Sequence, residues 1–132
     1  MNFTDEQVAY LESQRLGRLA TVDRHGAPQN NPVGYRYNPD LGTIDIGGHN
    51  LAASRKFRNL AVNDRVAFVV DDIVSFPPWR VRCLEIRGHA EALSDEDPLQ
   101  PGFTTDLIRI HPDRILSFGL TGDSGAGAPQ GS

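Results

Sequence analysis

The sequence has little cysteine and no long apolar run, and each shortage excludes a class of protein. Its 132 residues contain one cysteine, Cys83, so neither an internal disulfide nor a cysteine-rich metal site can form. No apolar stretch approaches the roughly 18 residues that a membrane-spanning helix needs, and the acidic N-terminus does not resemble a signal peptide. We therefore expect a cytoplasmic protein that is neither exported nor inserted into a membrane.

Basic residues are outnumbered as well. Thirteen Lys and Arg against seventeen Asp and Glu give a net charge of -4, which argues against a nucleic-acid binder with a wholly basic surface. The length suits one domain, and the hydrophobic fraction of 39%, concentrated in patterned segments, is enough for folding. From Gly119 onward Gly, Ala, Ser and Pro dominate, so we predict one domain over 1–120 and a flexible tail over 121–132.

Hydrophobic patterns predict many short strands and two short helices. The capping-box spacing of Thr4 and Gln7 predicts a helix over 5–15 that Gly17 ends, and Asn50 is expected to cap a second helix reaching Leu60. Apolar runs between turn residues predict the strands, and consecutive prolines predict an irregular loop. The content favours a small antiparallel barrel, mainly β with short helices. The strands are expected over 19–22, 29–37, 43–47, 66–70, 79–93 and 107–118, the last split by 111–113, and the loop over 71–78.

One short segment concentrates positive charge and is the candidate anion site. Arg55, Lys56 and Arg58 fall within four positions of the second predicted helix, and Lys56 is the only lysine in the chain. Guanidinium, ammonium and the hydroxyl of Ser54 together suit a phosphate, and glycines just before them allow the backbone to approach a ligand. The same spacing also fits a solvated basic face of a surface helix, so the pattern leaves both interpretations open.

The other chemistry-bearing residues give weaker signals. The four histidines are never three or four positions apart, so no helix places two of them on one metal ion, and we predict no metal site. Cys83 lies in an alternating strand and is predicted to pack there. No side chain is nominated as a catalytic nucleophile or base.

Six segments carry a specific combination of motifs: LGRLATV (16–22), PVGYRYN (32–38), TIDIGG (43–48), RKFRN (55–59), RVAFVVDD (65–72) and PWRVRCLEIRG (78–88). Together they resemble the flavin/deazaflavin split-barrel oxidoreductases. More narrowly, they resemble the pyridoxamine-phosphate-oxidase class that uses coenzyme F420, in the branch that contains a reductase of oxytetracycline biosynthesis. The similarity covers about residues 3–120. It implies a six-stranded antiparallel split barrel of the FMN-binding type and a homodimer with a cofactor groove between the subunits.

The resemblance also implies which residues bind the cofactor. Arg55 and Lys56, with Ser54, would hold the cofactor phosphate. The deazaflavin ring would lie against Asn31, Pro32 and Val33, and its polyol would lie near Gly48, His49 and Asn50. The same groove would also be reached by Trp79 and Arg80, from the same chain or from the partner.

The implied function is an F420-dependent reductase. It would transfer a hydride from reduced deazaflavin to an activated double bond of a small conjugated substrate, so no side-chain nucleophile is required. Two alternatives stay open: an oxidoreductase of the same fold that uses FMN, and a non-catalytic protein that carries F420 or a flavin. A nucleic-acid binder that uses the basic segment is disfavoured by the acidic balance.

Overall fold

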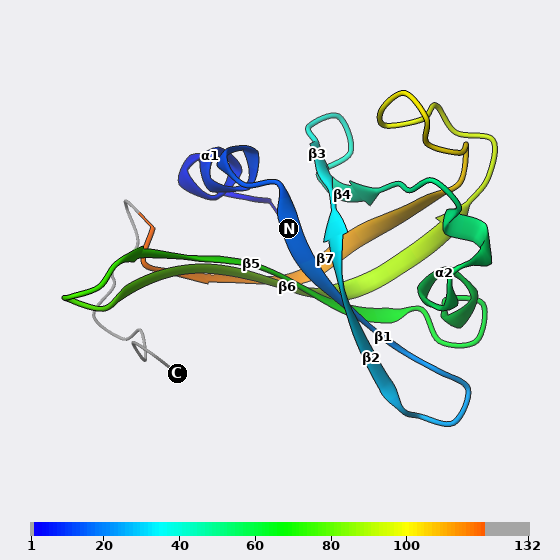
Figure 1. Cartoon of the computed structure of the whole chain (residues 1–132), viewed down its shortest axis with the longest axis horizontal. Helices are drawn as coiled ribbons and strands as arrows, with labels where there is room; N and C mark the ends of the chain where they lie inside the picture. Colours follow the sequence, from blue (N-terminus) through cyan, green and yellow to red (C-terminus); the bar gives the residue numbers. More distant parts are fainter. Residues whose placement is uncertain (1, 121–132) are drawn as a thin grey trace.

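The computed structural model describes residues 2–120, which form one strongly curled antiparallel sheet with short helices around it (Figure 1). The strands pair in the order β2-β1-β5-β6-β7-β4-β3. The two edge strands, β2 and β3, are consecutive in the chain and only Tyr35 separates them. The sheet therefore has to curl until its edges approach each other, which gives a split barrel. In chain order the elements are α1 (Asp5–Ser13), β1 (Leu16–Val22), β2 (Pro28–Gly34), β3 (Arg36–Asn38), β4 (Thr43–Ile46), the 3-10 turn η1 (Leu51–Ala53), α2 (Arg55–Asn59), β5 (Arg65–Ser75), β6 (Arg80–Leu93) and β7 (Leu107–Phe118).

The predicted mainly-β split barrel is confirmed, but the strand count differs from the expected six. The described residues contain seven strands because the single strand predicted over 29–37 is divided at Tyr35. Its first part pairs with β1, with Leu16 opposite Gly34, and its second part pairs with β4, with Tyr37 opposite Ile44. One polypeptide segment thus supplies both edges of the split barrel.

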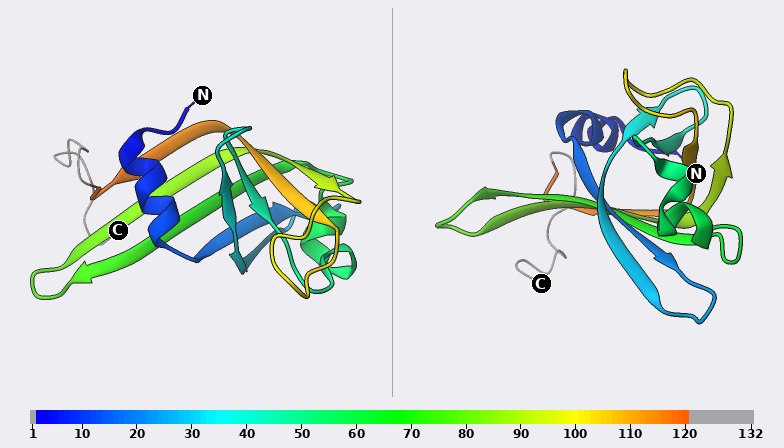
Figure 2. Two further views of the ribbon diagram at one scale, coloured as in Figure 1. Left: turned by 90° about the horizontal axis from the view of Figure 1, so that it is seen from above. Right: turned by 45° about the vertical axis from the view of Figure 1, so that its right-hand side comes forward.

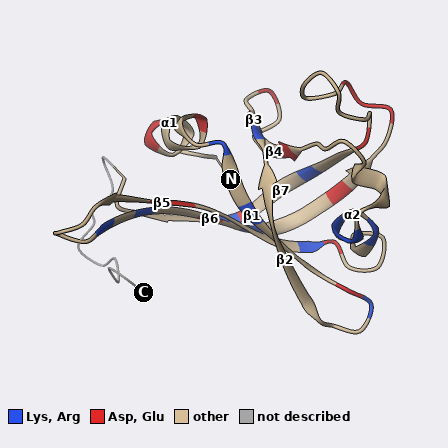
Figure 3. Ribbon diagram, in the orientation of Figure 1, with Lys and Arg blue, Asp and Glu red and all other residues tan. Residues whose placement is uncertain are grey.

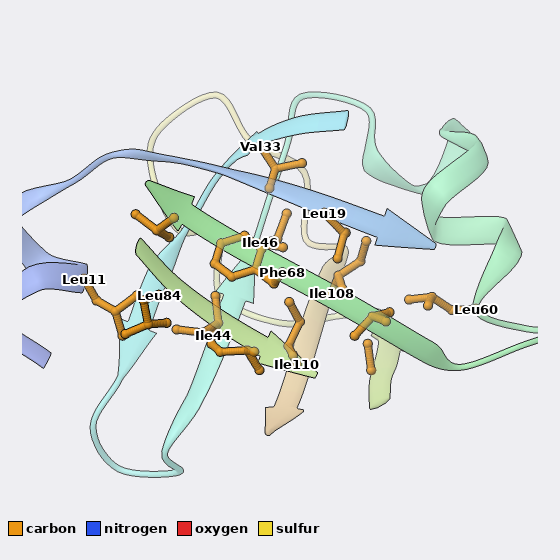
Figure 4. Packing of buried hydrophobic residues seen from close by; sticks show 14 of the residues in the cluster. Leu11, Leu19, Val33, Ile44, Ile46, Leu60, Phe68, Leu84, Ile108 and Ile110 are labelled. Carbon is orange, nitrogen blue, oxygen red and sulfur yellow. The ribbon is translucent and has the colours of Figure 1, made fainter. Parts of the chain in front are cut away.

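Alternate residues of the strands fill the barrel (Figure 4). Phe68 lies at the centre of the cluster and is fully buried, as are Leu19, Ile86 and Ile110. Each such side chain contributes about 1.5–3 kcal/mol by leaving water. The ring of Phe68 occupies the space beside Gly17, where an added Cβ would lie 2.3 Å from the ring. Residues that alternate with the core residues face away from the barrel, and we call that side of the sheet the outer face.

Both predicted helices are shorter than expected. The first begins at the predicted capping box but ends at Ser13 instead of residue 15, because the chain joins β1 from Leu16 onward and Gly17 is a strand residue. The second is replaced by η1 and α2, which Ser54 separates as the capping residue of α2. The side chain of Asn50 makes no capping hydrogen bond.

The irregular loop predicted over 71–78 is wrong for most of its length. Strand β5 continues to Ser75 and pairs with β6, so the consecutive prolines occupy only the tip of the hairpin. This hairpin extends beyond the rest of the sheet, and α1 lies across its base (Figure 2). The Tyr10 hydroxyl donates to Asp72 Oδ1 at 2.8 Å, and Arg82 donates to both oxygens of the same carboxylate at 3.0 and 2.7 Å. These contacts tie α1 to the hairpin.

The last strand is continuous, not split by 111–113. The register of β6 and β7 shifts between Arg87, which faces Arg114, and Gly88, which faces Pro112, so Asp113 is the extra residue of a β-bulge. Pairing between β7 and β4 ends at Ile110, so the missing N–H of the proline removes no bond to β4. The tail predicted to be flexible, 121–132, lies outside the described residues. No helix of residues 2–120 has the length and apolar character needed to cross a membrane.

Candidate functional site

The basic segment lies on α2, beside the turn that joins β1 to β2 (Figure 3). Between them is a hollow of about 430 Å³, which we call the α2 hollow. It brings three guanidinium groups together, two from the helix and one from the turn. Helical spacing explains the pair from α2, because residues three and four positions apart share one face. The α2 hollow is lined by Asp23, Arg24, His25, Arg55, Arg58, Asn59 and Val62.

Asn59 fixes the helix against the hairpin. Its side chain is 7% exposed and its Nδ2 donates to Thr21 Oγ1 at 3.0 Å and to Gln29 Oε1 at 2.9 Å. A buried amide contributes only when its donors are satisfied, so these two bonds define how α2 sits on β1 and β2. The sequence pattern assigns no role to Asn59. The signal in the sequence that could have pointed to it is its position at the end of a basic helix.

The β1–β2 turn is fixed by a local hydrogen-bond network. Asp23 accepts from the backbone N–H groups of His25 at 2.8 Å and Ala27 at 2.9 Å. Both hydrogen bonds hold the pKa of the Asp23 carboxyl below its ordinary value, and the bond from the Ala27 N–H has the larger effect. Arg24 Nε donates to His25 Nε2 at 3.2 Å, so this imidazole nitrogen acts as an acceptor. Arg24 and His25 are site residues that sequence reasoning misses, because their segment carries only the pattern of a turn.

The three residues predicted to bind the cofactor phosphate differ in their position relative to the α2 hollow. Arg55 lines the α2 hollow, whereas Lys56, one position along the helix, is not among the residues that line it. The hydroxyl of Ser54 donates to the Leu51 carbonyl at 2.6 Å and accepts from the Phe57 N–H at 3.3 Å. Ser54 therefore already serves as the helix cap, and its role toward a phosphate stays a prediction.

The segment before α2 is pinned to the loop that precedes β7. Thr104 N donates to the Gly48 carbonyl at 2.9 Å, and Nδ1 of His49 lies 3.1 Å from the Gly102 carbonyl. The imidazole also packs edge-on against Phe103, with ring centroids 5.0 Å apart. The loop thus fixes the backbone of Gly48 and the side chain of His49, both predicted cofactor residues, and Asn50 beside them is exposed.

The three predicted residues of β2 divide between the surface and the core. Asn31 and Pro32 are exposed on the edge strand, whereas Val33 is 6% exposed and belongs to the core cluster. The structure brings this strand close to α2 through the contact between Gln29 and Asn59. Asn31 and Pro32 are therefore accessible to a ligand, and Val33 can contribute its backbone.

Trp79 and Arg80 lie elsewhere. They line a separate hollow of about 340 Å³ at the far end of the β5–β6 hairpin, together with Pro78, Val81 and Gly119. In Figure 1 this end and α2 lie at opposite ends of the molecule. Within one chain, the structure therefore does not bring these two residues to the α2 hollow.

Burial favours the protonated forms of two side chains, the Cys83 thiol and the Tyr35 phenol. Burial raises the pKa of the Cys83 thiol to about 11. Burial also raises the pKa of the Tyr35 phenol above its ordinary value, and its hydroxyl donates to the Leu11 carbonyl at 2.6 Å. Across residues 2–120 no group of three or more His, Cys, Asp or Glu is placed to hold a metal ion. What the α2 hollow offers a ligand is the positive charge of Arg24, Arg55 and Arg58.

Comparisons with known proteins support a specific relationship. The family model described as pyridoxamine 5'-phosphate oxidase matches residues 3–121. A protein of Streptomyces rimosus subsp. rimosus named 5a,11a-dehydrotetracycline/5a,11a-dehydrooxytetracycline reductase is 47% identical over 128 residues, which is 96% of this chain and 90% of that protein.

Solved structures share the fold at lower identity. The conserved hypothetical protein Rv2991 of Mycobacterium tuberculosis superposes with a TM-score of 0.66 at 23% identity, over 87% of this chain and 84% of that one. The FAD binding protein of Mycobacterium smegmatis superposes with a TM-score of 0.62 at 21% identity, over 87% of this chain and 93% of that one. At these identities the likeness establishes the split-barrel fold and nothing about ligands.

Proposed function

The chain belongs to the pyridoxamine 5'-phosphate oxidase family, and on that premise we propose that it is an F420-dependent reductase. The substrate would be a small conjugated compound with an activated carbon-carbon double bond, of the kind named for the Streptomyces relative. The observation that carries the proposal is the α2 hollow, where Arg24, Arg55 and Arg58 surround a space open to a ligand.

The α2 hollow fits a phosphate. Guanidinium groups offer paired N–H donors that match phosphate oxygens, and each charge-assisted hydrogen bond is worth about 1.5–3 kcal/mol. Of the described acidic residues only Asp23 lines the hollow, and its carboxylate is already engaged by the N–H groups of the turn. Arg24, Arg55 and Arg58 would hold the phosphate of the cofactor, and the exposed Asn31 and Pro32 of β2 would lie along its ring.

The side chains need only bind and orient the reactants. When bound, reduced deazaflavin supplies the hydride, and the protein positions it against the substrate and excludes water. Two sets of fixed contacts favour such positioning, since Asn59 holds α2 to the hairpin and the loop around Gly102 holds His49. The protonated Cys83 and Tyr35 are structural in this scheme.

We propose further that the site is shared between two copies of the chain. Trp79 and Arg80 lie at the end of the β5–β6 hairpin, and in Figure 1 the tip of this hairpin and α2 are at opposite ends of the molecule. A partner whose β5–β6 hairpin extends over that hollow would bring both residues to the cofactor. The large apolar side chains exposed near the hairpin tip, among them Phe76 at 70% exposed, support an association of this kind.

Cofactor identity is the first test. Purified protein is titrated separately with F420 and with FMN, and quenching of each cofactor's fluorescence gives the dissociation constant. We expect F420 to bind at least tenfold more tightly, and reduced F420 to be oxidised when 5a,11a-dehydrooxytetracycline is added. Tighter FMN binding with turnover of reduced FMN would replace F420 by FMN. Binding of F420 without turnover of any conjugated acceptor would indicate a carrier.

Charge-neutralising variants test the α2 hollow itself. Arg55→Gln and Arg58→Gln are each expected to weaken cofactor binding about tenfold, since each removes at least one charge-assisted contact of about 1.5 kcal/mol. Lys56→Gln, outside the residues that line the hollow, should weaken it less. Arg15→Gln, an exposed arginine before β1, is the control for loss of one charge. Unchanged cofactor affinity in the double Arg55→Gln, Arg58→Gln variant would remove the phosphate assignment.

A further inference from the structure

A second hollow lies on the outer face of the sheet, and the proposed cofactor contacts do not use it. It has a volume of about 490 Å³, and we call it the outer-face hollow. Strands β1, β5, β6 and β7, which are neighbours in the sheet, together with Pro28 at the start of β2, form its lining. The residues that line it are Ala20, Thr21, Val22, Pro28, Arg65, Val66, Ala67, Arg87, Gly88, Asp113 and Arg114.

Three arginines from three different strands surround this hollow. Arg87 of β6 and Arg114 of β7 are direct partners in the ladder, and like charges placed opposite each other destabilise a sheet. Arg65 of β5 lies on the same outer face. A cluster of this kind is favourable where an anion bridges it.

The neighbouring carboxylates compensate this charge only in part. Glu85 accepts from Arg87 Nε at 3.0 Å and from Nη2 at 3.3 Å. Asp113 lies 3.2 Å from His89 Nδ1. Among the described residues, neither Arg65 nor Arg114 has an ion pair. Two guanidinium groups thus remain available to a ligand.

The floor between the arginines is apolar, and its side chains are small. Ala20 and Ala67 are paired across β1 and β5, and Ala67 is paired in turn with Arg87 of β6. Both alanines alternate with the core residues of their strands, Leu19 and Phe68, so their methyl groups lie on the outer face. A flat ring system can therefore lie against the sheet while its acidic groups reach the arginines.

We propose that the outer-face hollow binds a flat conjugated anion, such as a polycyclic enolate or phenolate, and that this anion is the substrate. The proposal rests on the proposed reductase function for the identity of the ligand as substrate. The position supports it, because the same β1–β2 hairpin lines both hollows, with residues 20–22 in the outer-face hollow and residues 23–25 in the α2 hollow.

Oxytetracycline is a suitable probe because it is fluorescent and carries a conjugated polycyclic enolate, and because its binding requires no turnover. Its dissociation constant is measured by its own fluorescence for the wild-type protein and for a double Arg65→Gln, Arg114→Gln variant. We expect the double variant to bind the probe at least tenfold more weakly, while its affinity for F420 and its melting temperature stay near those of the wild type. Arg15→Gln, at the other end of β1, should bind the probe as the wild type does.

Two results would overturn the proposal: no measurable probe binding to the wild-type protein, and equal probe affinity in the double variant. If the double variant keeps its probe affinity and also changes its sedimentation, Arg65 and Arg114 are interface residues instead. If the wild-type protein binds the probe through Arg65 and Arg114 but no cofactor supports reduction, the reductase function fails and this binding site stands.

Discussion

At the scale of single residues, Gly17 shows how one absent side chain determines core packing. An added Cβ would lie 2.3 Å from Phe68 Cζ and 2.6 Å from Cε1, and the fully buried ring has no space into which it can move. We predict that Gly17→Ala lowers the free energy of unfolding by about 1–3 kcal/mol, the usual cost of overpacking. Chemical denaturation measures this loss.

Gly34→Ala is the matched control, because Gly34 is on the neighbouring strand and faces no such neighbour. The nearest heavy atom to its added Cβ is the Arg15 carbonyl oxygen at 3.9 Å. We expect this variant to stay within about 0.5 kcal/mol of the wild type. Equal losses in the two variants would show that strand glycines matter for reasons other than the Phe68 contact.

At the scale of elements, Asp72 joins the first helix to the long hairpin. The hydrogen bonds from Arg82, together with that from Tyr10, hold the pKa of the Asp72 carboxyl below its ordinary value. A lowered folded-state pKa gives a stabilisation that is complete above the unfolded pKa of about 4 and is lost as the pH falls through the folded value. We predict that Asp72→Asn lowers stability by about 1–2 kcal/mol at neutral pH, allowing for the partial exposure of the pair.

The pH dependence gives this prediction its sharpest test. The difference in urea midpoint between the wild type and Asp72→Asn should be largest near neutral pH and shrink as the pH falls below about 4. Asp71→Asn is the control, since Asp71 lies 3.5 Å from Arg18 in an exposed pair that is worth at most about 1 kcal/mol. A difference that grows in acid would contradict the assigned role of the Asp72 carboxylate.

The elements also show what the sequence could and could not predict. The capping box of Thr4 and Gln7 is confirmed, because both of its hydrogen bonds are local and join residues of a single helical turn. The division of 29–37 at Tyr35 was missed, because it depends on which strands the two halves meet after the sheet has curled. For the same reason the predicted end of β5 was too early: the pairing partner, β6, sustains the strand beyond its apolar run.

The candidate site divides in the same way. The sequence predicts the basic character of α2 from Arg55, Lys56 and Arg58 alone. It does not predict which of them face a ligand, because the helix is capped by Ser54 instead of Asn50 and its orientation depends on the buried contacts of Asn59. Arg24 joins the α2 hollow from a turn some thirty residues earlier, and nothing in a linear pattern reports such a contact.

At the scale of the whole molecule, the exposed apolar side chains of the β5–β6 hairpin predict self-association. Ile73, Val74, Phe76 and Trp79 are between 48% and 70% exposed, all of them close to the hairpin tip, and such a patch normally lies in an interface. We expect the protein to sediment as a dimer, at about twice the 14.5 kDa of one chain. A double Ile73→Ser, Phe76→Ser variant should sediment as a monomer.

The monomeric variant should also lose cofactor affinity, because Trp79 and Arg80 would no longer be supplied by the partner. Its α2 hollow stays intact, so a loss of at least tenfold in F420 binding would separate the partner's contribution from that of Arg55 and Arg58. Leu41→Ser is the matched control, since Leu41 is 56% exposed at the β3–β4 turn, far from the hairpin tip, and should change neither property. A wild-type protein that sediments as a monomer, or a monomeric variant that binds F420 with unchanged affinity, would show that one chain forms the whole site.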